Sequence, residues 1–426
     1  MPGTPVAQHT PPPNLRPPTG LLVAAWLLAL LLNALVAYYR PATSPDSDRY
    51  QRIAINLADG NGYSASEAAP YQPDLLRVPL YPTFIATVIR LAGPNWTAVR
   101  LVQALLMSFL VPLGWLIAAR CFDRTTALVT AFAVACYPTY WLYAGQLLSD
   151  GVAAVVTAVA AVALIRSLRD KGLIWSLLAG LAGGLMCLIK PVMLLFPAVA
   201  LIAYVVGADT TPRLAVRRWA VYVLTFALTV MPWTIRNYAV SGKLIPMTAG
   251  KGIVLYQIAR LSETGFTIPQ YHQQIETADP RLLVARAAPD PAVTLQLDRD
   301  LTRDGMAIIH RHPWRYLCTI ACNPLLVWVN RWTFVNGVMV QSRTLLLLSL
   351  MYLVTGVLGI MLQRQQWRRA IVPLTFIVYI SLVHAPLWTE PRQSIPARLF
   401  LLMFVAYAVA RGLARARPGI YEEADG

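Results

Sequence analysis

Charged side chains are scarce in this sequence of 426 residues. Asp, Glu, Lys and Arg together make up 13% of it, whereas ordinary soluble domains carry roughly 25%. The apolar residues, 57% of the chain, fall in blocks of about 16–20 residues, the length that spans a bilayer. A soluble chain of this length would show amphipathic stripes instead. The scarcity of charge therefore excludes a soluble protein and predicts an integral membrane protein.

Cysteine is also scarce, and the five cysteines are poorly placed for a shared role. Only Cys318 and Cys322 lie within one helical turn of each other, and no His or carboxylate lies near enough to complete a zinc spacing. The others in apolar runs pack as small hydrophobic side chains. The sequence therefore predicts neither a disulfide framework nor a cysteine metal site.

A glycine-rich phosphate loop of nucleotide-binding spacing is missing too. Gly180, Gly183 and Gly184 instead lie inside an apolar block, where small residues let helices approach closely. The net charge of +16 is not accompanied by a folded nucleic-acid reader. We interpret it as arginine in cytoplasmic loops and expect no nucleic-acid partner.

Ten apolar blocks qualify as transmembrane helices. They cover residues 20–38, 98–118, 125–145, 150–166, 173–189, 191–207, 219–235, 344–363, 370–387 and 397–413. No small-residue cleavage motif follows the first block, so we expect an uncleaved helix. Residues 1–19 and 414–426 are predicted to be cytoplasmic tails, the first disordered because it is rich in proline and polar residues. Residues 20–413 then form one transmembrane domain.

Arginine is concentrated in alternate breaks between the blocks. These clusters are Arg120 and Arg124; Arg166, Arg169 and Lys171; Arg213, Arg217 and Arg218; Arg364, Arg368 and Arg369; and Arg411, Arg415 and Arg417. The positive-inside rule then places both termini in the cytoplasm. Two long segments, 39–97 and 236–343, face outward, and we expect the first to be a folded loop. The apolar stretch 316–330 within the second is short for a span and is flanked by Trp314 and Trp332, which favours an interfacial helix over a span.

Three acidic residues stand at the outer membrane surface in this topology. Asp46 and Asp48 follow the first span closely, and Asp150 opens another span in a short break without other charges. An ionisable residue at the end of a span is a candidate for a functional site. The alternative is that each carboxylate only caps the helix that follows it.

Four cations share that face, namely Arg77, Lys190, Arg236 and Arg392. Each could reach lipid phosphates by extending along the apolar surface. Together with the carboxylates they form a mixed set, which suits an anionic leaving group beside a proton acceptor.

Several motifs in this order resemble bacterial family-39 glycosyltransferases of the GT-C fold, which include aminoarabinose transferases and protein O-mannosyltransferases. The motifs are Asp46-x-x-x-Tyr50-x-x-x-Ala54-x-x-Leu57-x-x-Gly60-x-Gly62-Tyr63-Ser64, Arg77-x-Pro79-x-Tyr81-Pro82, Pro232-Trp233-x-x-Arg236-Asn237-Tyr238 with Gly242, His312-Pro313, and Arg392 to Pro396. The sequence departs from the family at Asp150, where Glu is frequent, and the segment 236–343 is too small for the extra domain that some members carry.

The resemblance implies an all-α, GT-C-like multi-span bundle in the bacterial inner membrane, with its active site facing outward. It implies transfer of a hexose or pentose from a polyprenyl-phosphate donor to a lipid, glycan or protein acceptor, with inversion at the anomeric carbon. Asp46 holds the position of the base, with Asp48 as its competitor, and Asp150 could orient the base, bind the acceptor or hold a divalent cation. Arg77, Lys190 and Arg236 are expected at the donor phosphate, and Tyr50, Tyr81 and Arg392 at the substrate.

Functions from other classes make different predictions. A transporter or a flippase of lipid-linked glycans would carry charge deep within its spans and show two similar halves, and neither pattern is visible. A glycan polymerase or ligase would be an enzyme of related chemistry. A membrane scaffold would not need the ordered acidic and basic set.

Overall fold

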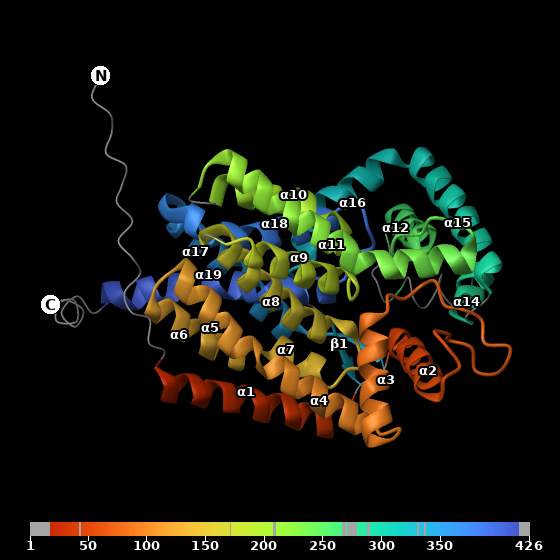
Figure 1. The fold of residues 1–426 in the computed structure, drawn as a ribbon, viewed down its shortest axis with the longest axis horizontal. Coiled ribbons are helices and arrows are strands. Elements are labelled where there is room, and N and C mark those ends of the chain that lie inside the picture. Colours follow the sequence, from red (N-terminus) through yellow and green to blue (C-terminus); the bar gives the residue numbers. More distant parts are fainter. Residues whose placement is uncertain are drawn as a thin grey trace.

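A computed structural model describes most of the chain, as a bundle of helices with further helices at one end (Figure 1). The described residues are 18–41, 44–170, 172–207, 210–265, 270, 279–287, 290–329, 332–335 and 338–416. The predicted tails lie largely outside them, since only residues 18–19 and 414–416 of the tails are described.

The long apolar helices lie side by side along one axis. They are α1 (Thr19–Tyr39), α4 and α5 (Trp96–Ser108 and Leu110–Cys121), α8 (Ser149–Arg169), α11 (Pro212–Ser241), α17 (Arg343–Leu362), and the 3₁₀ helix η4 (Pro391–Ser394) with α19 (Ile395–Ala416). By length and composition, six described helices could cross a membrane, or seven if the bent pair α6 (Arg124–Ala135) and α7 (Pro138–Ala144) counts as one span. The chain is therefore a multi-pass membrane protein.

The remaining predicted spans are shorter or broken helices, so the expected number of ten is not confirmed. Residues 173–189 form α9 (Ile174–Cys187), and residues 191–207 form η1 (Pro191–Leu195) with α10 (Phe196–Gly207). Residues 370–387 correspond to α18 (Ile371–Val383), which follows η3 (Arg364–Ala370). Proline begins both η1 and α7, because its ring fits the first turn of a helix but interrupts a longer one.

The glycines of α9 explain how this bundle packs. A Cβ atom at Gly180 would overlap the carbonyl oxygen of Tyr222 in α11, and one at Gly184 would lie 2.5 Å from Cβ of Thr229. Only a residue without a side chain lets the two backbones approach so closely. The predicted role of these glycines in helix packing is therefore confirmed.

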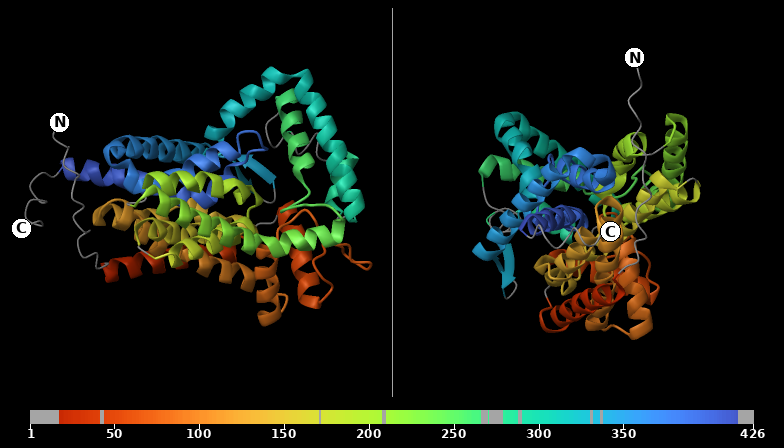
Figure 2. Two further views of the ribbon diagram at one scale, coloured as in Figure 1. Left: turned by 45° about the horizontal axis from the view of Figure 1, so that its top comes forward. Right: turned by 90° about the vertical axis from the view of Figure 1, so that its left-hand side faces the viewer.

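The two long segments predicted to share one membrane face lie at the same end of the bundle. From the first come α2 (Pro45–Asp59) and α3 (Leu80–Ala92), which run across the bundle axis; from the second come α12 (Lys251–Thr264), α14 (Pro280–Arg286) and α15 (Pro291–Arg311). Helix α1 begins, and α19 ends, at the opposite end (Figures 1 and 2).

Helix α16 (Pro313–Leu326) leads from α15 back to the bundle. The amide of Asn323 donates hydrogen bonds to the carbonyls of Ala385 and Leu387, just after α18. At 14 residues α16 is not among the helices long enough to cross a membrane, and its interfacial position stays a prediction. Within the described residues, the fold is all-α apart from a two-stranded hairpin of β1 (Trp332–Val335) and β2 (Val338–Gln341).

Candidate functional site

The first turn of α2 carries Asp46 and Asp48. The N-cap of this helix is Ser44, whose side chain accepts from the backbone N–H of Ser47 in a reciprocal capping box. The alternative that either carboxylate caps α2 is therefore wrong. The side chain of Asp46 is 29% exposed and that of Asp48 is exposed, and both benefit from the positive end of the helix dipole.

The loop after α2 is held by a buried carboxylate that sequence analysis missed, Asp74. Its Oδ1 accepts hydrogen bonds from the backbone N–H groups of Leu76 and Arg77, at 2.8 and 2.9 Å. Its other oxygen pairs with Arg49, whose Nε lies 2.6 Å away. Arg49 also donates to the carbonyl of Ala285 in the second long segment. An Asp that accepts from N–H groups two and three residues later is typical of a turn, and this turn fixes the backbone of Arg77.

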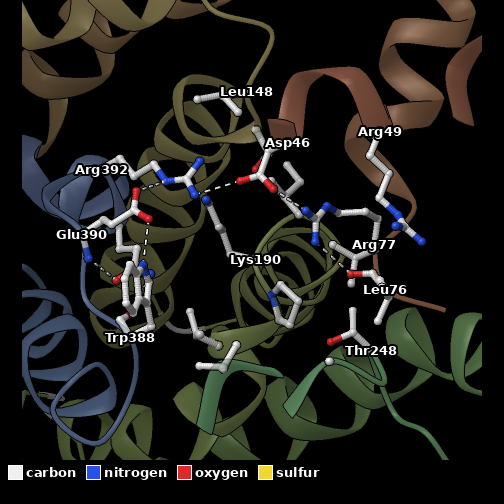
Figure 3. A pocket seen from close by; sticks show the side chains of 18 of the residues that line it. Asp46, Arg49, Leu76, Arg77, Leu148, Lys190, Thr248, Trp388, Glu390 and Arg392 are labelled. Carbon is white, nitrogen blue, oxygen red and sulfur yellow. Dashed lines mark hydrogen bonds and ion pairs between the residues drawn. The ribbon is translucent and has the colours of Figure 1, made fainter. Parts of the chain in front are cut away.

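A cavity of about 850 Å³ opens between the end of the bundle and the helices of the two long segments. Its lining includes α2, the turn before η1, residues 384–396, and a roof that we define as the lining residues within 248–257 and 282–285. Six of the nine predicted site residues line it: Asp46, Asp48, Tyr50, Arg77, Lys190 and Arg392. Figure 3 shows Asp46 between the side chains of Arg77 and Arg392.

Ion pairs connect the charged side chains in this cavity. Oδ1 of Asp46 pairs with Arg77, and its Oδ2 lies 2.8 Å from Nη2 of Arg392. Nε of Arg392 lies 2.8 Å from Oε2 of Glu390, whose other oxygen accepts from the indole N–H of Trp388 (Figure 3). Burial by itself would raise the pKa of Asp46, but the charges of Arg77, Arg392 and Lys190 outweigh it and hold that pKa well below its usual range.

Asp150 and Lys190 form a second pair at the base of the cavity. The carboxylate of Asp150 is 1% exposed and lies 2.6 Å from Nζ of Lys190. Lys190 lines the cavity and Asp150 does not. Because the N-cap of α8 is Leu148, without a side-chain cap, the alternative that Asp150 caps this helix is also wrong.

Two other predicted residues, Arg236 and Tyr81, do not line the cavity. Arg236 donates to the carbonyl of Asp74 at 2.7 Å and lies over the rings of Tyr63 and Trp233. Tyr81 is buried and donates to the side chain of Gln103 at 2.8 Å. Their contacts support the loop and the bundle beneath the cavity.

Arg398, at the start of α19, is a fully buried cation that sequence analysis overlooked. It donates to the hydroxyls of Tyr137 and Ser394, at 2.6 and 2.9 Å, and to the carbonyls of Trp328 and Pro391. None of these partners is a carboxylate, and Arg398 lies at the end of the predicted span 397–413 rather than deep within it. Since Pro391 and Ser394 bound η4, Arg398 holds the turn that carries Arg392.

The cavity also contains groups whose roles were not predicted. His384 is buried in its wall, with Nδ1 2.9 Å from the carbonyl of Ile380. Glu390 was visible in the sequence only as a neighbour of Arg392. A metal ion would need several His, Cys, Asp or Glu side chains close together. The part of the chain that the structure describes contains no group of three or more of them that could hold one, so we assign no ligands to the possible divalent cation.

Comparison with known proteins supports the fold. The family model of dolichyl-phosphate-mannose-protein mannosyltransferases matches residues 72–235, less than half of the chain. No curated protein sequence matches this chain.

Among solved structures, the oligosaccharyltransferase AglB from Archaeoglobus fulgidus, in complex with an inhibitory peptide and a dolichol-phosphate, aligns with a TM-score of 0.57 at 16% identity. This alignment covers 93% of the present chain and 51% of AglB. The same archaeal enzyme tethered to an acceptor peptide gives a TM-score of 0.59 at 13% identity over 94% of this chain and 50% of that one. ArnT from Cupriavidus metallidurans bound to undecaprenyl phosphate gives a TM-score of 0.45 at 15% identity. This alignment covers 95% of the present chain and 81% of ArnT.

The chain thus spans about half the length of the oligosaccharyltransferase it resembles. The likeness extends over nearly all of the present chain, and the predicted GT-C-like fold is confirmed.

Proposed function

We propose that this protein is a membrane glycosyltransferase that moves one monosaccharide from a polyprenyl-phosphate donor to a lipid, glycan or protein acceptor. The observation that carries the proposal is the cavity at one end of the bundle, in which Arg77, Arg392 and Lys190 surround the carboxylate of Asp46. The resemblance to the mannosyltransferase family and the dolichol-phosphate in the archaeal neighbour support a polyprenyl-phosphate donor.

The donor's two chemical parts fit two parts of this cavity. Its lower wall includes the apolar side chains of Ile189, Val192 and Ile380, which suit the first units of an isoprenoid chain. The cations beside that wall suit its phosphate, because guanidinium groups bind phosphate oxygens in a fork and stabilise the charge that develops on a leaving phosphate.

The reaction then requires one proton transfer. The hydroxyl oxygen of the acceptor attacks the anomeric carbon, the bond from that carbon to the phosphate oxygen breaks, and its electron pair stays on the phosphate. Asp46 takes the proton of the attacking hydroxyl. A single attack from the face opposite the phosphate inverts the anomeric centre.

A transporter or flippase is less well supported by the positions of the charges. The one cation described as fully buried in α19, Arg398, contacts hydroxyls and carbonyls and does not line the cavity. A glycan polymerase or ligase remains the alternative within the same chemistry, and it differs in the size of the group that is transferred.

The donor class can be tested with purified protein. We expect turnover with a polyprenyl-phosphate monosaccharide, none with nucleotide sugars, and none with lipid-linked oligosaccharides. The physical reason is that the cavity offers an apolar wall and cations but no nucleotide loop. The measurement is mass spectrometry of the acceptor after incubation with each donor in detergent. Turnover of a nucleotide sugar without any lipid would refute the proposal, and transfer of whole oligosaccharides would favour the ligase.

The orientation can be tested separately in cells. The arginine alternation predicts that the start of α11 is cytoplasmic and that α2 faces outward, in a bacterial inner membrane. In a variant without native cysteines, we expect an impermeant reagent to label Asp59→Cys, at the end of α2, in intact cells. Arg217→Cys should be labelled only after permeabilisation. The opposite pattern would place the cavity on the cytoplasmic side.

A further inference from the structure

Asp46 is the base in the proposed reaction, but its ion pairs with two arginines make it a weak base. Arg77 pairs with Oδ1 of Asp46, and Arg392 lies 2.8 Å from Oδ2. Between two guanidinium groups the pKa of this carboxyl stays well below its usual range. General-base catalysis is most efficient when the pKa lies near the working pH, so something must separate Asp46 from its arginines before the proton is taken.

Both arginines have anchors that do not involve Asp46. Nε of Arg392 is bound by Glu390 at 2.8 Å. Arg77 donates to the carbonyl of Leu76 at 3.3 Å and lies over the ring of Tyr50, with its Cζ 5.5 Å from the centroid. Its backbone is fixed by Asp74. Each guanidinium group would therefore keep its place in the cavity if Asp46 moved away.

A phosphodiester is a suitable replacement for the carboxylate. It carries one negative charge, as Asp46 does, so it can take the carboxylate's place between the two guanidinium groups without leaving either buried cation unpaired. Its oxygens accept hydrogen bonds from a guanidinium fork in the same way as carboxylate oxygens. The side chains of Arg77, Arg392 and Asp46 are 27%, 25% and 29% exposed, so a ligand in the cavity can reach all three.

We propose that the donor phosphate and Asp46 compete for Arg77 and Arg392, so that binding of the donor itself releases Asp46 to act as the base. This inference rests on the proposed function. Without donor, Asp46 is locked in its ion pairs and cannot activate a hydroxyl. With donor, the arginines hold the phosphate, and Asp46 is free to accept the proton.

The same competition resets the site after transfer. The proton of the acceptor is then on Asp46, and the electron pair of the broken bond is on the polyprenyl phosphate. When this product leaves, the guanidinium groups return to Asp46 and expel its proton to water. No further reactant is needed to balance the cycle.

Binding of unsubstituted polyprenyl phosphate tests the competition without any turnover. Titration calorimetry in detergent would compare wild type with Asp46→Asn and Asp59→Asn. We expect Asp46→Asn to bind about tenfold or more tightly than wild type, because the competing charge is removed. Asp59→Asn makes the same charge change at the other end of α2, on an exposed side chain that does not line the cavity, and should bind within about twofold of wild type. Equal or weaker binding by Asp46→Asn, or an equal gain in Asp59→Asn, would overturn the proposal.

A second measurement uses only the wild-type enzyme. The pH dependence of kcat/KM for the donor reports the free enzyme, whereas that of kcat reports the donor complex. The base must be ionised, so both parameters fall as the pH falls through its pKa in each state. We expect kcat to fall at a higher pH than kcat/KM does, since the donor phosphate holds the arginines and the pKa of Asp46 is therefore higher in the donor complex. If both parameters fall at the same pH, the competition is contradicted.

The results separate this inference from the proposed function. If Asp46→Asn loses turnover but binds polyprenyl phosphate as wild type does, the proposed function stands and the competition is wrong. If wild type binds no polyprenyl phosphate, both are wrong.

Discussion

Asp46→Asn is expected to lower turnover by about two orders of magnitude or more while the protein still inserts and folds. Asn keeps the size of the side chain but is not a base at neutral pH. The fold should persist because Ser44, and not Asp46, caps α2. The measurement is initial rate at saturating donor and acceptor, with the thermal unfolding temperature of each variant in detergent as the check on folding.

Asp48→Asn is the matched control for this experiment. Asp48 lies in the same turn and lines the same cavity, but it is exposed, and no ion pair to it is found among the described residues. We expect its turnover to stay near that of wild type. If Asp48→Asn is the inactive variant, the base is Asp48. If both variants turn over normally, the base is not in this loop, and Asp150 becomes the first residue to test.

Lys190→Met is expected to lower the free energy of unfolding by about 3–5 kcal/mol and to abolish turnover. Removal of the ammonium group leaves Asp150, which is 1% exposed, as an unpaired buried carboxylate. Thermal unfolding in detergent and the transfer assay would measure the two effects. Unchanged stability would mean that this ion pair does not hold α8 to the turn before η1.

The double variant Lys190→Met with Asp150→Asn separates two roles of Lys190. It removes both charges, so the stability lost in the single variant should largely return. If Lys190 also binds the donor phosphate, turnover stays low and KM for the donor rises. Full recovery of turnover together with stability would show that Lys190 is only the counter-ion of Asp150.

The sequence located the charged side chains but not their directions. Charges are so rare here that Asp46, Arg77, Lys190 and Arg392 could be predicted to share one membrane face, and all four line the cavity. Arg236 and Tyr81 have the same depth and chemistry, yet their side chains contact the loop and the bundle. Only the packing of the loop against α11 and α4 decides that difference.

The residues that sequence analysis missed are those that act through others. Asp74 and Glu390 position Arg77 and Arg392, and their partners are set by the turns that contain them. Arg398 was assigned to an apolar span, since a hydropathy pattern does not reveal the hydroxyls and carbonyls that surround a buried cation. The number of spans stays unconfirmed for a similar reason: the pattern does not distinguish a full crossing from helices as short as α9 or bent by 44° as α6 and α7 are.

The length of α11 sets the height of the cavity relative to the bilayer. Its 30 residues extend about 45 Å, whereas the hydrocarbon core is about 30 Å thick and a typical tilt shortens the span only slightly. The excess, on the order of 10 Å, covers one headgroup layer and little more. The chain that leaves α11 forms part of the roof of the cavity, so the proposed function places the transfer within the headgroup layer. In that reaction the acceptor has to bring its hydroxyl down to the lipid surface, which favours acceptors that are membrane-bound or flexible over rigid proteins in solution.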